Sequence, residues 1–436
     1  MTDKSKVLFL IVGMGNKKDP KYPESYLRLL RKAVDSTDAG NIILLPSGSS
    51  KENAERIKTE YESSRTVFVQ DLPERSMEFD ADACYEFFES LFRSRFREGF
   101  SAENFIIDFT HGTKAMSAAL YAIGMRYRVS DFHYIRRNND KDGNLIDGET
   151  VKNFDASYAR GLSVLDQCKT LFKAWQFSAA TALLSIEKPK KTLKQTFEHV
   201  KMLADFYSAW DRLDYKTAAE NCPVFEMPLF GFATSSAVQN WIKTLAKPIV
   251  EPDEKNFEVL PQSVLNENAE TALNMMLDLY ANGLRRLEAG QYEDAGIRAY
   301  RIAEMMGQYY LFKAGYISNH MSSSDSTVHA FAENIHLRKN EKADIYPPFG
   351  RKQVIEFLDY IKHPKVEYLR SIDTKIADIR NNSILIHGYA SRVKDIQDLK
   401  NIFNSLTEQL RQLSAEEWLS KKNTALFMNN FKDNKW

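Results

Sequence analysis

The fold is indicated most clearly by residues 105–117, which read FIIDFTHGTKAMS. An apolar run is followed by a short polar turn and then by the start of a helix. A run that is apolar on both faces is typical of a strand in a parallel sheet with helices on both sides. The turn from Thr110 to Thr113 is therefore expected where a buried strand ends and a helix N-terminus presents free backbone N–H groups.

The same alternation of β-rich and helical segments extends over residues 1–155 and predicts a Rossmann-like parallel sheet. The expected strands are Val7–Val12, Asn41–Leu45, Thr66–Val69, Phe105–Phe109 and Phe132–Ile135, with helices over Tyr22–Ser36, Glu52–Ser63, Ala81–Glu98 and Lys114–Arg128. In a doubly wound sheet the first and fourth strands are neighbours at the topological switch point. The loop Gly13-Met14-Gly15-Asn16 is therefore expected to face the same crevice as the turn from Thr110 to Thr113.

This crevice is predicted to bind a ligand that carries phosphate. The two threonines can cap the helix or donate to phosphate oxygens, the glycine between them permits close approach, and the lysine after them adds a positive charge. The candidate ligand-binding residues are Gly13, Gly15, Asn16, Ser47, Thr110, His111, Gly112, Thr113 and Lys114. The alternative is a pair of ordinary strand-to-helix turns, because Gly and Thr are common there.

The pattern does not fit the standard dinucleotide or ATP motifs. Lys18 stands where a third glycine would be, and the second strand ends at Pro46 and Ser47 instead of an acidic ribose ligand. A complete Walker A sequence is absent.

Beyond residue 156 the strand pattern nearly disappears, so the fold class is α/β plus all-α. The predicted domains are residues 1–155, a ligand-sensing sheet domain; 156–265, a helical linker domain; and 266–436, a second helical domain. The proline-rich stretch Pro223–Pro261 predicts an irregular connector, and the polar stretch Asn138–Gly148 predicts a hairpin or a domain edge.

Composition excludes several classes of protein. The 59 basic and 59 acidic residues cancel, so no global field steers the protein to nucleic acid or to a membrane. The three cysteines exclude a disulfide framework, and no histidine spacing suits a metal. No segment approaches the ~20 apolar residues of a membrane-spanning helix. We therefore expect a cytoplasmic protein with no membrane partner and no metal.

Arg380 and His387 form a second candidate site. Seven positions on an α-helix are close to two full turns, so both side chains are expected on one face, about 10 Å apart. A two-fold homodimer would bring the histidine of one chain near the arginine of the other. Such a pair suits cleavage of RNA by its own 2′-hydroxyl, because histidine moves protons near neutral pH and arginine stabilises phosphorane charge. Asn381 is a candidate helper. On spacing alone, a solvated arginine and an ordinary histidine remain the alternative.

Together the two motifs resemble a known family. Residues 108–117, DFTHGTKAMS, look like the CARF domain of CRISPR-associated proteins, and Arg380 to His387 looks like the Arg-x(4 to 6)-His motif of HEPN ribonucleases. Residues 292–301 are similar to an early helix on the HEPN side. The chain thus resembles the CARF–HEPN ribonucleases of type III CRISPR systems, the Csm6/Csx1-like family. It departs in having His111-Gly112 where many CARF domains carry two glycines, which leaves the size of the ligand open.

The resemblance implies a function in antiviral defence. Cyclic oligoadenylate would bind across a CARF homodimer as an allosteric activator, and no other cofactor is implied. The activated HEPN domain would act as an endoribonuclease on single-stranded RNA and leave 2′,3′-cyclic phosphate ends.

Two alternatives remain open. The first is a CARF regulator with a non-catalytic helical domain that binds a partner, although such a protein would be expected to lack Arg380 or His387. The second is a ring nuclease that degrades its own ligand, with Lys114, Thr113 and Asn16 as candidate residues.

Overall fold

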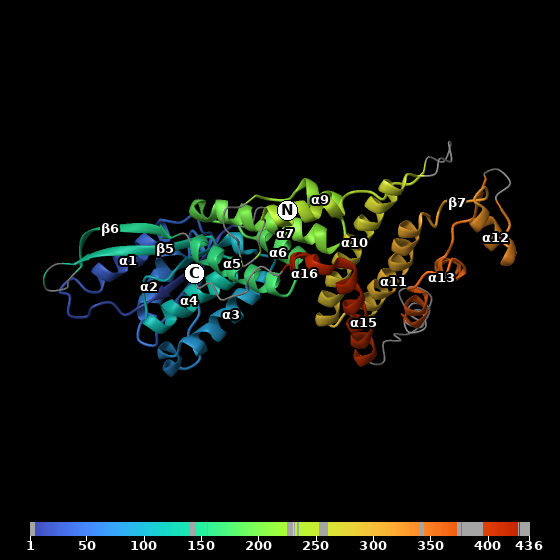
Figure 1. Ribbon diagram of the computed structural model, residues 1–436. Coiled ribbons are helices and arrows are strands. Elements are labelled where there is room, and N and C mark those ends of the chain that lie inside the picture. The colour runs from blue at the N-terminus through green and yellow to red at the C-terminus, as the bar shows by residue number, and fades with distance from the viewer. Residues whose placement is uncertain are drawn as a thin grey trace. The chain divides into compact units, whose positions relative to one another are not determined.

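The computed structural model describes residues 5–139, 141, 145–154, 156–224, 230, 232, 235–252, 260–339, 344–372, 376, 396–425 and 427. The chain forms two compact units, which comprise residues 1–165 with 187–195 and residues 166–186 with 196–436. The large sheet belongs to the first unit, whereas the second unit is almost entirely helical in its described parts (Figure 1). This is the predicted α/β plus all-α organisation. The boundaries at residues 155 and 265 stay predictions.

The first unit contains a six-stranded sheet with the order β3-β2-β1-β4-β5-β6. Its neighbouring strands are parallel except for the antiparallel pair β5 and β6. The strands are β1 Val7–Val12, β2 Asn41–Pro46, β3 Thr66–Val69, β4 Phe105–Asp108, β5 Asp131–Asn139 and β6 Leu145–Phe154. The five predicted strands are confirmed, and β1 is adjacent to β4 as predicted. The sequence does not predict β6, but the expected hairpin is present as the pair of β5 and β6.

Helices cover both faces of this sheet. The helices α1 Glu24–Asp35 and α2 Lys51–Tyr61 pack on one face, and α3 Ala81–Arg97 and α4 Lys114–Arg126 pack on the other. Successive residues of β1 alternate between the two cores, since Leu8 joins the first core and Phe9 joins the second. The Phe9 ring stacks on Phe92 of α3 with a centroid distance of 4.2 Å. Burial on both faces explains why β1 is apolar throughout.

The second unit is built from helices. They are the later part of α5 Ser157–Lys173, then α6 Phe177–Ile186, most of α7 Lys194–Asp211, α8 Tyr215–Glu220, α9 Ser236–Leu245, α10 Gln262–Glu288, α11 Tyr292–Ala314, α12 Ser326–Asn334, α13 Arg351–Tyr360, α15 Ile396–Ser414 and α16 Trp418–Ala425. A short antiparallel ribbon joins β7 Met321–Ser322 to β8 Ile345–Tyr346. The long helices α10 and α11 lie side by side (Figure 1).

One prediction in this region is wrong. The stretch Pro223–Pro261 is not irregular throughout, because α9 occupies its middle. The Ser235 hydroxyl accepts a hydrogen bond from the Val238 N–H and caps this helix, which buries Val238, Trp241, Ile242 and Leu245. These four apolar residues have helical spacing, but the surrounding prolines conceal so short a pattern.

The chain returns to the first unit between α6 and α7. In this returning segment, the buried Glu187 pairs with Arg160 at 3.2 Å and with Arg128 at 3.7 Å. Arg160 also donates to the Val129 carbonyl, 2.7 Å away, just before β5. A buried carboxylate with two arginines therefore anchors residues 187–195 to the sheet unit.

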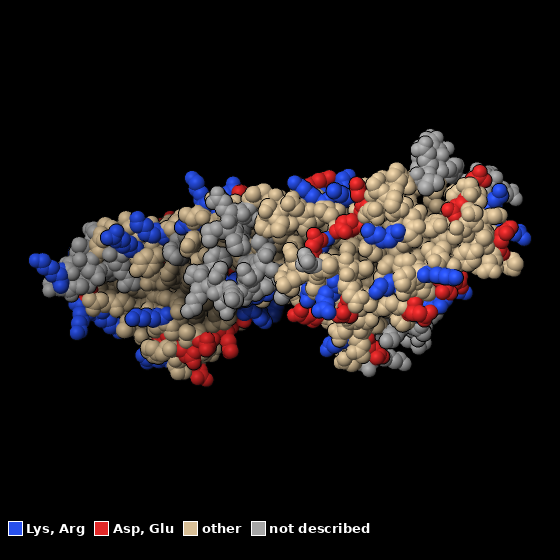
Figure 2. Space-filling model, viewed as in Figure 1, with Lys and Arg blue, Asp and Glu red and all other residues tan. Residues whose placement is uncertain are grey.

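Both signs of charge occur on the face that Figure 2 displays. Acidic side chains gather in one patch on the described part of the first unit, and basic and acidic side chains are interspersed over the described part of the second unit. No helix in the described part of the chain is both long enough and apolar enough to cross a membrane.

Candidate functional site

A polar cleft of about 560 Å³ lies at the carboxyl edge of the parallel strands. The loops that follow β1, β2, β3 and β4 all contribute to it, as expected when parallel strands end at a common edge. Its lining residues are Gly13, Met14, Gly15, Asn16, Tyr26, Ser47, Ser49, Glu78, Phe79, Gly112 and Thr113.

The loops after β1 and β4 meet closely in this cleft. A Cβ atom on Gly13 would lie 2.8 Å from the backbone nitrogen of Gly112, so only glycine fits at residue 13 without a shift. Gly112 has φ of +82°, a left-handed conformation that favours glycine. The Gly13 N–H donates to the Tyr26 hydroxyl at 2.8 Å. The predicted shared crevice is therefore present, and its two loops are held in close contact.

Thr113 begins α4 as its N-cap. Its hydroxyl oxygen accepts a hydrogen bond from the Met116 N–H at 3.2 Å and donates to the backbone carbonyl of Glu78. The sequence predicts that Thr113 either caps the helix or donates to phosphate oxygens, and the structure confirms the cap. The hydroxyl also ties the start of α4 to the loop after β3. The helix N-terminus beside it favours negative charge at this end of the cleft.

The structure brings six of the nine candidate ligand residues into the cleft lining and leaves three outside it. The six are Gly13, Gly15, Asn16, Ser47, Gly112 and Thr113. The Thr110 hydroxyl accepts from the Ile135 N–H at 2.8 Å, and the buried His111 ring lies edge-on to the Tyr26 ring. Lys114 is exposed on the first turn of α4. Ligand binding by all nine residues stays a prediction.

The sequence analysis missed Tyr26, Glu78 and Phe79 as parts of the cleft. Tyr26 lies on the core-facing side of α1, and nothing in the sequence separates it from an ordinary core residue. Glu78 and Phe79 end a 3₁₀ turn over Arg75–Phe79, in the connection between β3 and α3. The sequence could have indicated these two residues, because the connection after β3 starts at the same sheet edge as the two predicted loops.

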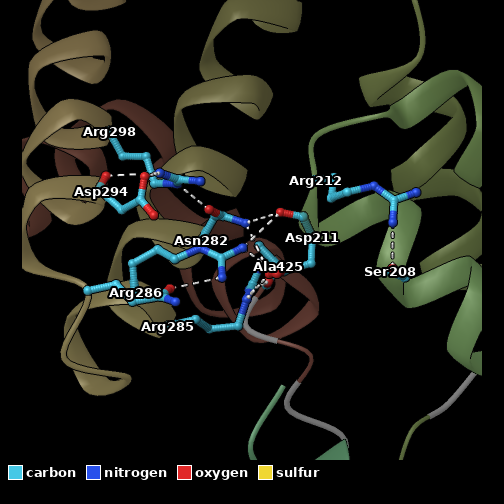
Figure 3. A network of polar contacts seen from close by, with 10 residues as sticks. Ser208, Asp211, Arg212, Asn282, Arg285, Arg286, Asp294, Arg298 and Ala425 are labelled. Carbon is cyan, nitrogen blue, oxygen red and sulfur yellow. Dashed lines mark hydrogen bonds and ion pairs between the residues drawn. The ribbon is translucent and has the colours of Figure 1, made fainter. Parts of the chain in front are cut away.

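The second candidate site, Arg380 with Asn381 and His387, lies outside the described residues. The helices of the same unit that precede it are described, and they enclose a buried polar network (Figure 3). At its centre, the Asp211 carboxylate at the end of α7 accepts hydrogen bonds from Arg285 Nε at 3.0 Å and Asn282 Nδ2 at 3.1 Å. Asp211 also pairs with Arg286. One carboxylate thus organises three polar side chains of α10.

The network extends to α11 and to the C-terminal segment. The Asn282 amide oxygen accepts from Arg298 of α11, and Arg285 Nη1 donates to the Ala425 carbonyl at 2.8 Å. The Arg285 guanidinium carbon lies 3.7 Å from the centre of the Phe427 ring, a cation–π arrangement. Burial lowers the pKa of Arg285, whereas the nearby carboxylate of Asp211 opposes that shift.

A second buried carboxylate, Asp278, lies one turn away from Asn282 on α10. It accepts hydrogen bonds from Trp210 Nε1 at 2.8 Å and from the Tyr215 hydroxyl at 2.9 Å. Burial raises the pKa of Asp278, and these hydrogen bonds only partly offset that effect. The two carboxylates join α7 and α8 to α10 through polar contacts.

Comparisons with known proteins match both helical parts of the chain. The Csm6 6H domain family matches residues 162–245, and the Csm6 HEPN domain family matches residues 265–413. A comparison with curated proteins finds no match. Among solved structures, Enterococcus italicus Csm6 bound to cyclic hexa-2′-fluoro-hexa-dAMP is similar with a TM-score of 0.55 and 14% sequence identity, over 97% of this chain and 98% of that one.

The fold and these matches define a class of protein in which a Rossmann-like sheet unit is followed by 6H and HEPN helical domains. Within that class, the chain is a Csm6-like CARF–HEPN protein.

Proposed function

We propose that this protein is a cyclic oligoadenylate-activated, metal-independent endoribonuclease that cleaves single-stranded RNA in type III CRISPR antiviral defence. It acts as a homodimer in the cytoplasm. The observation that carries the proposal is the cleft at the switch point of the sheet, in a chain whose residues 265–413 match the Csm6 HEPN domain. The structurally similar Csm6 is bound to a cyclic hexanucleotide analogue.

The cleft supports a phosphodiester ring as the activator. The capped N-terminus of α4 places a positive dipole end at the cleft, and Gly112 keeps the backbone open to a ligand there. A cyclic oligoadenylate repeats its phosphates around a ring, so a two-fold pair of such clefts complements it.

The proposed chemistry belongs to Arg380 and His387. The histidine acts as the proton-transfer group and the arginine stabilises the charge that grows on the phosphorane, with Asn381 donating to a phosphate oxygen. The RNA 2′-hydroxyl is the nucleophile, so the 5′-oxygen leaves and the product carries a 2′,3′-cyclic phosphate and a free 5′-hydroxyl.

The deciding experiment incubates pure protein with end-labelled single-stranded RNA, each cyclic oligoadenylate separately, and EDTA. We expect RNA cleavage to depend on one ring size and to continue in EDTA. A strict requirement for added magnesium would overturn the metal-independent mechanism. Cleavage that is equally fast with and without every ring would overturn activation by the ligand.

A further inference from the structure

The cleft exposes an aromatic side chain at its rim. Phe79 is 74% exposed and lines the cleft at the end of the 3₁₀ turn Arg75–Phe79. An isolated exposed phenylalanine is not unusual on a protein surface, but this one borders a polar cleft whose other lining residues are mostly glycine, serine, asparagine and threonine. It offers a flat apolar face at the place where a ligand would enter.

The residue before it holds this turn in place. Glu78 is only 4% exposed, and its carboxylate accepts a hydrogen bond from the Gly48 N–H at 2.6 Å. Its backbone carbonyl accepts from the Thr113 hydroxyl. The turn that carries Phe79 is therefore tied to the loop after β2 and to the start of α4, so the ring is presented from an anchored backbone.

The charges divide the cleft into two parts. The N-terminus of α4 favours an anion, whereas the carboxylate of Glu78 repels one. The second carboxylate oxygen of Glu78 lies 4.0 Å from Arg75 Nε, which is beyond hydrogen-bond distance. Phosphate is thus expected beside Thr113, and a neutral group that donates a hydrogen bond is expected beside Glu78.

We propose that Phe79 stacks on an adenine base of the ligand and that Glu78 accepts a hydrogen bond from the exocyclic amino group of that base. This inference rests on the proposed function and specifies which part of the ligand each side of the cleft recognises. Stacking on an aromatic ring contributes affinity for any base, whereas the carboxylate selects a base that has an amino donor.

The stacking is tested by calorimetry with cyclic hexaadenylate, cyclic tetraadenylate and linear hexaadenylate. Phe79→Ala and Phe79→Leu are each expected to raise the dissociation constant roughly 10-fold, and Phe79→Trp is expected to restore wild-type affinity, because leucine keeps the apolar surface but not the aromatic face. The melting temperature should not change, since the ring is exposed. Val224→Ala, at a residue that is 78% exposed outside the cleft lining, is the matched control and should bind like the wild type.

Base selection is tested with a cyclic ring in which purine riboside, which lacks the 6-amino group, replaces adenosine. Wild-type protein should bind the adenine ring more tightly than the purine ring. Glu78→Gln should lose roughly 10-fold of that preference, because the glutamine oxygen would keep the hydrogen bond from the Gly48 N–H and the NH2 donor would then face the base. If Glu78→Gln keeps the wild-type preference for the adenine ring over the purine ring, Glu78 does not recognise the amino group.

The results separate this inference from the proposed function. If cyclic oligoadenylate binds and activates but Phe79→Ala and Phe79→Leu bind it as tightly as the wild type, the stacking inference is wrong and the proposed function stands. If only linear hexaadenylate binds, with the same dependence on Phe79, the inference stands and activation by a ring is wrong. Failure of every adenine oligonucleotide to bind would overturn both.

Discussion

At the scale of single residues, the proposed RNA chemistry depends on Arg380 and His387. Arg380→Ala or His387→Ala is expected to reduce RNA cleavage by a factor of ~100 or more, because each removes a group that acts on the reacting phosphate. Ligand binding should persist in both variants. His336→Ala, at an exposed histidine of the same unit, serves as the control. A double variant that cleaves RNA at the wild-type rate would place the active site elsewhere.

Gly112 is a residue whose backbone conformation is essential to the cleft. Its φ of +82° is left-handed, and an added Cβ would collide with the Ile11 side chain under the loop. Gly112→Ala is therefore expected to cost about 2–4 kcal/mol of unfolding free energy, from the left-handed backbone and from overpacking.

The matched control for Gly112 is Gly290. It is also left-handed, with φ of +75°, but nothing lies within 4 Å of an added Cβ. Gly290→Ala should cost only the backbone term, about 1–2 kcal/mol. Denaturant unfolding of both variants measures the difference, and equal losses would show that contact with Ile11 is unimportant.

At the scale of elements, Asp211 joins the end of α7 to α10. Removing its carboxylate leaves Arg285, which is 2% exposed, without its charged partner, so Asp211→Ala is expected to cost about 3–5 kcal/mol of unfolding free energy. Asp205→Ala, at an exposed position on the same helix, should change stability by less than about 1 kcal/mol. Urea denaturation compares the two. Similar losses would mean that the network contributes little.

The buried carboxylate of Asp278 on α10 is expected to make the unfolding free energy depend on pH. Its pKa is raised in the folded state by burial, so the folded protein holds its proton more tightly than the unfolded chain. The resulting stabilisation is complete below the unfolded pKa of about 4 and is lost as the pH rises through the folded pKa. Relative to Asp278→Asn, which cannot ionise, the wild type should lose unfolding free energy between pH 4 and neutral pH. Parallel denaturation curves for both proteins measure this, and a pH-independent difference would contradict it.

At the scale of the whole molecule, activation requires that one ligand be shared by two chains. A ligand shifts a dimer toward an active arrangement only if it binds that arrangement more tightly. Titration calorimetry should therefore report one ring per two chains, whereas one ring per chain would refute the shared site.

Lys114 tests the connection between the ligand and RNA cleavage. Lys114→Ala is expected to weaken ligand binding and to raise the ligand concentration needed for half-maximal cleavage, because it removes a positive charge beside the cleft. Lys58→Ala is the control, since Lys58 lies in the last turn of α2, a helix that starts at the cleft edge and runs away from it. Equal ligand requirements in the two variants would exclude a role for Lys114.

The sequence by itself determined five strands of the sheet, the adjacency of the first and fourth strands, and two of the loops that form the cleft. These features depend on local patterns, because apolar runs define buried strands and a short glycine-containing turn marks the start of a helix. Even the adjacency of β1 and β4 follows from a general rule of doubly wound sheets. The sequence missed β6, because most of its residues are polar, and it missed α9, because this short helix lies among prolines.

Only the tertiary structure decided which side chains complete the cleft and the polar network. Tyr26 has the pattern of a core residue, yet its hydroxyl binds the Gly13 backbone. Arg285 reaches partners 74 and 140 residues away along the chain, Asp211 and Ala425. Pairings at such separations leave no periodic signal in the sequence, because they depend on how whole helices pack and on which buried polar groups must then satisfy one another.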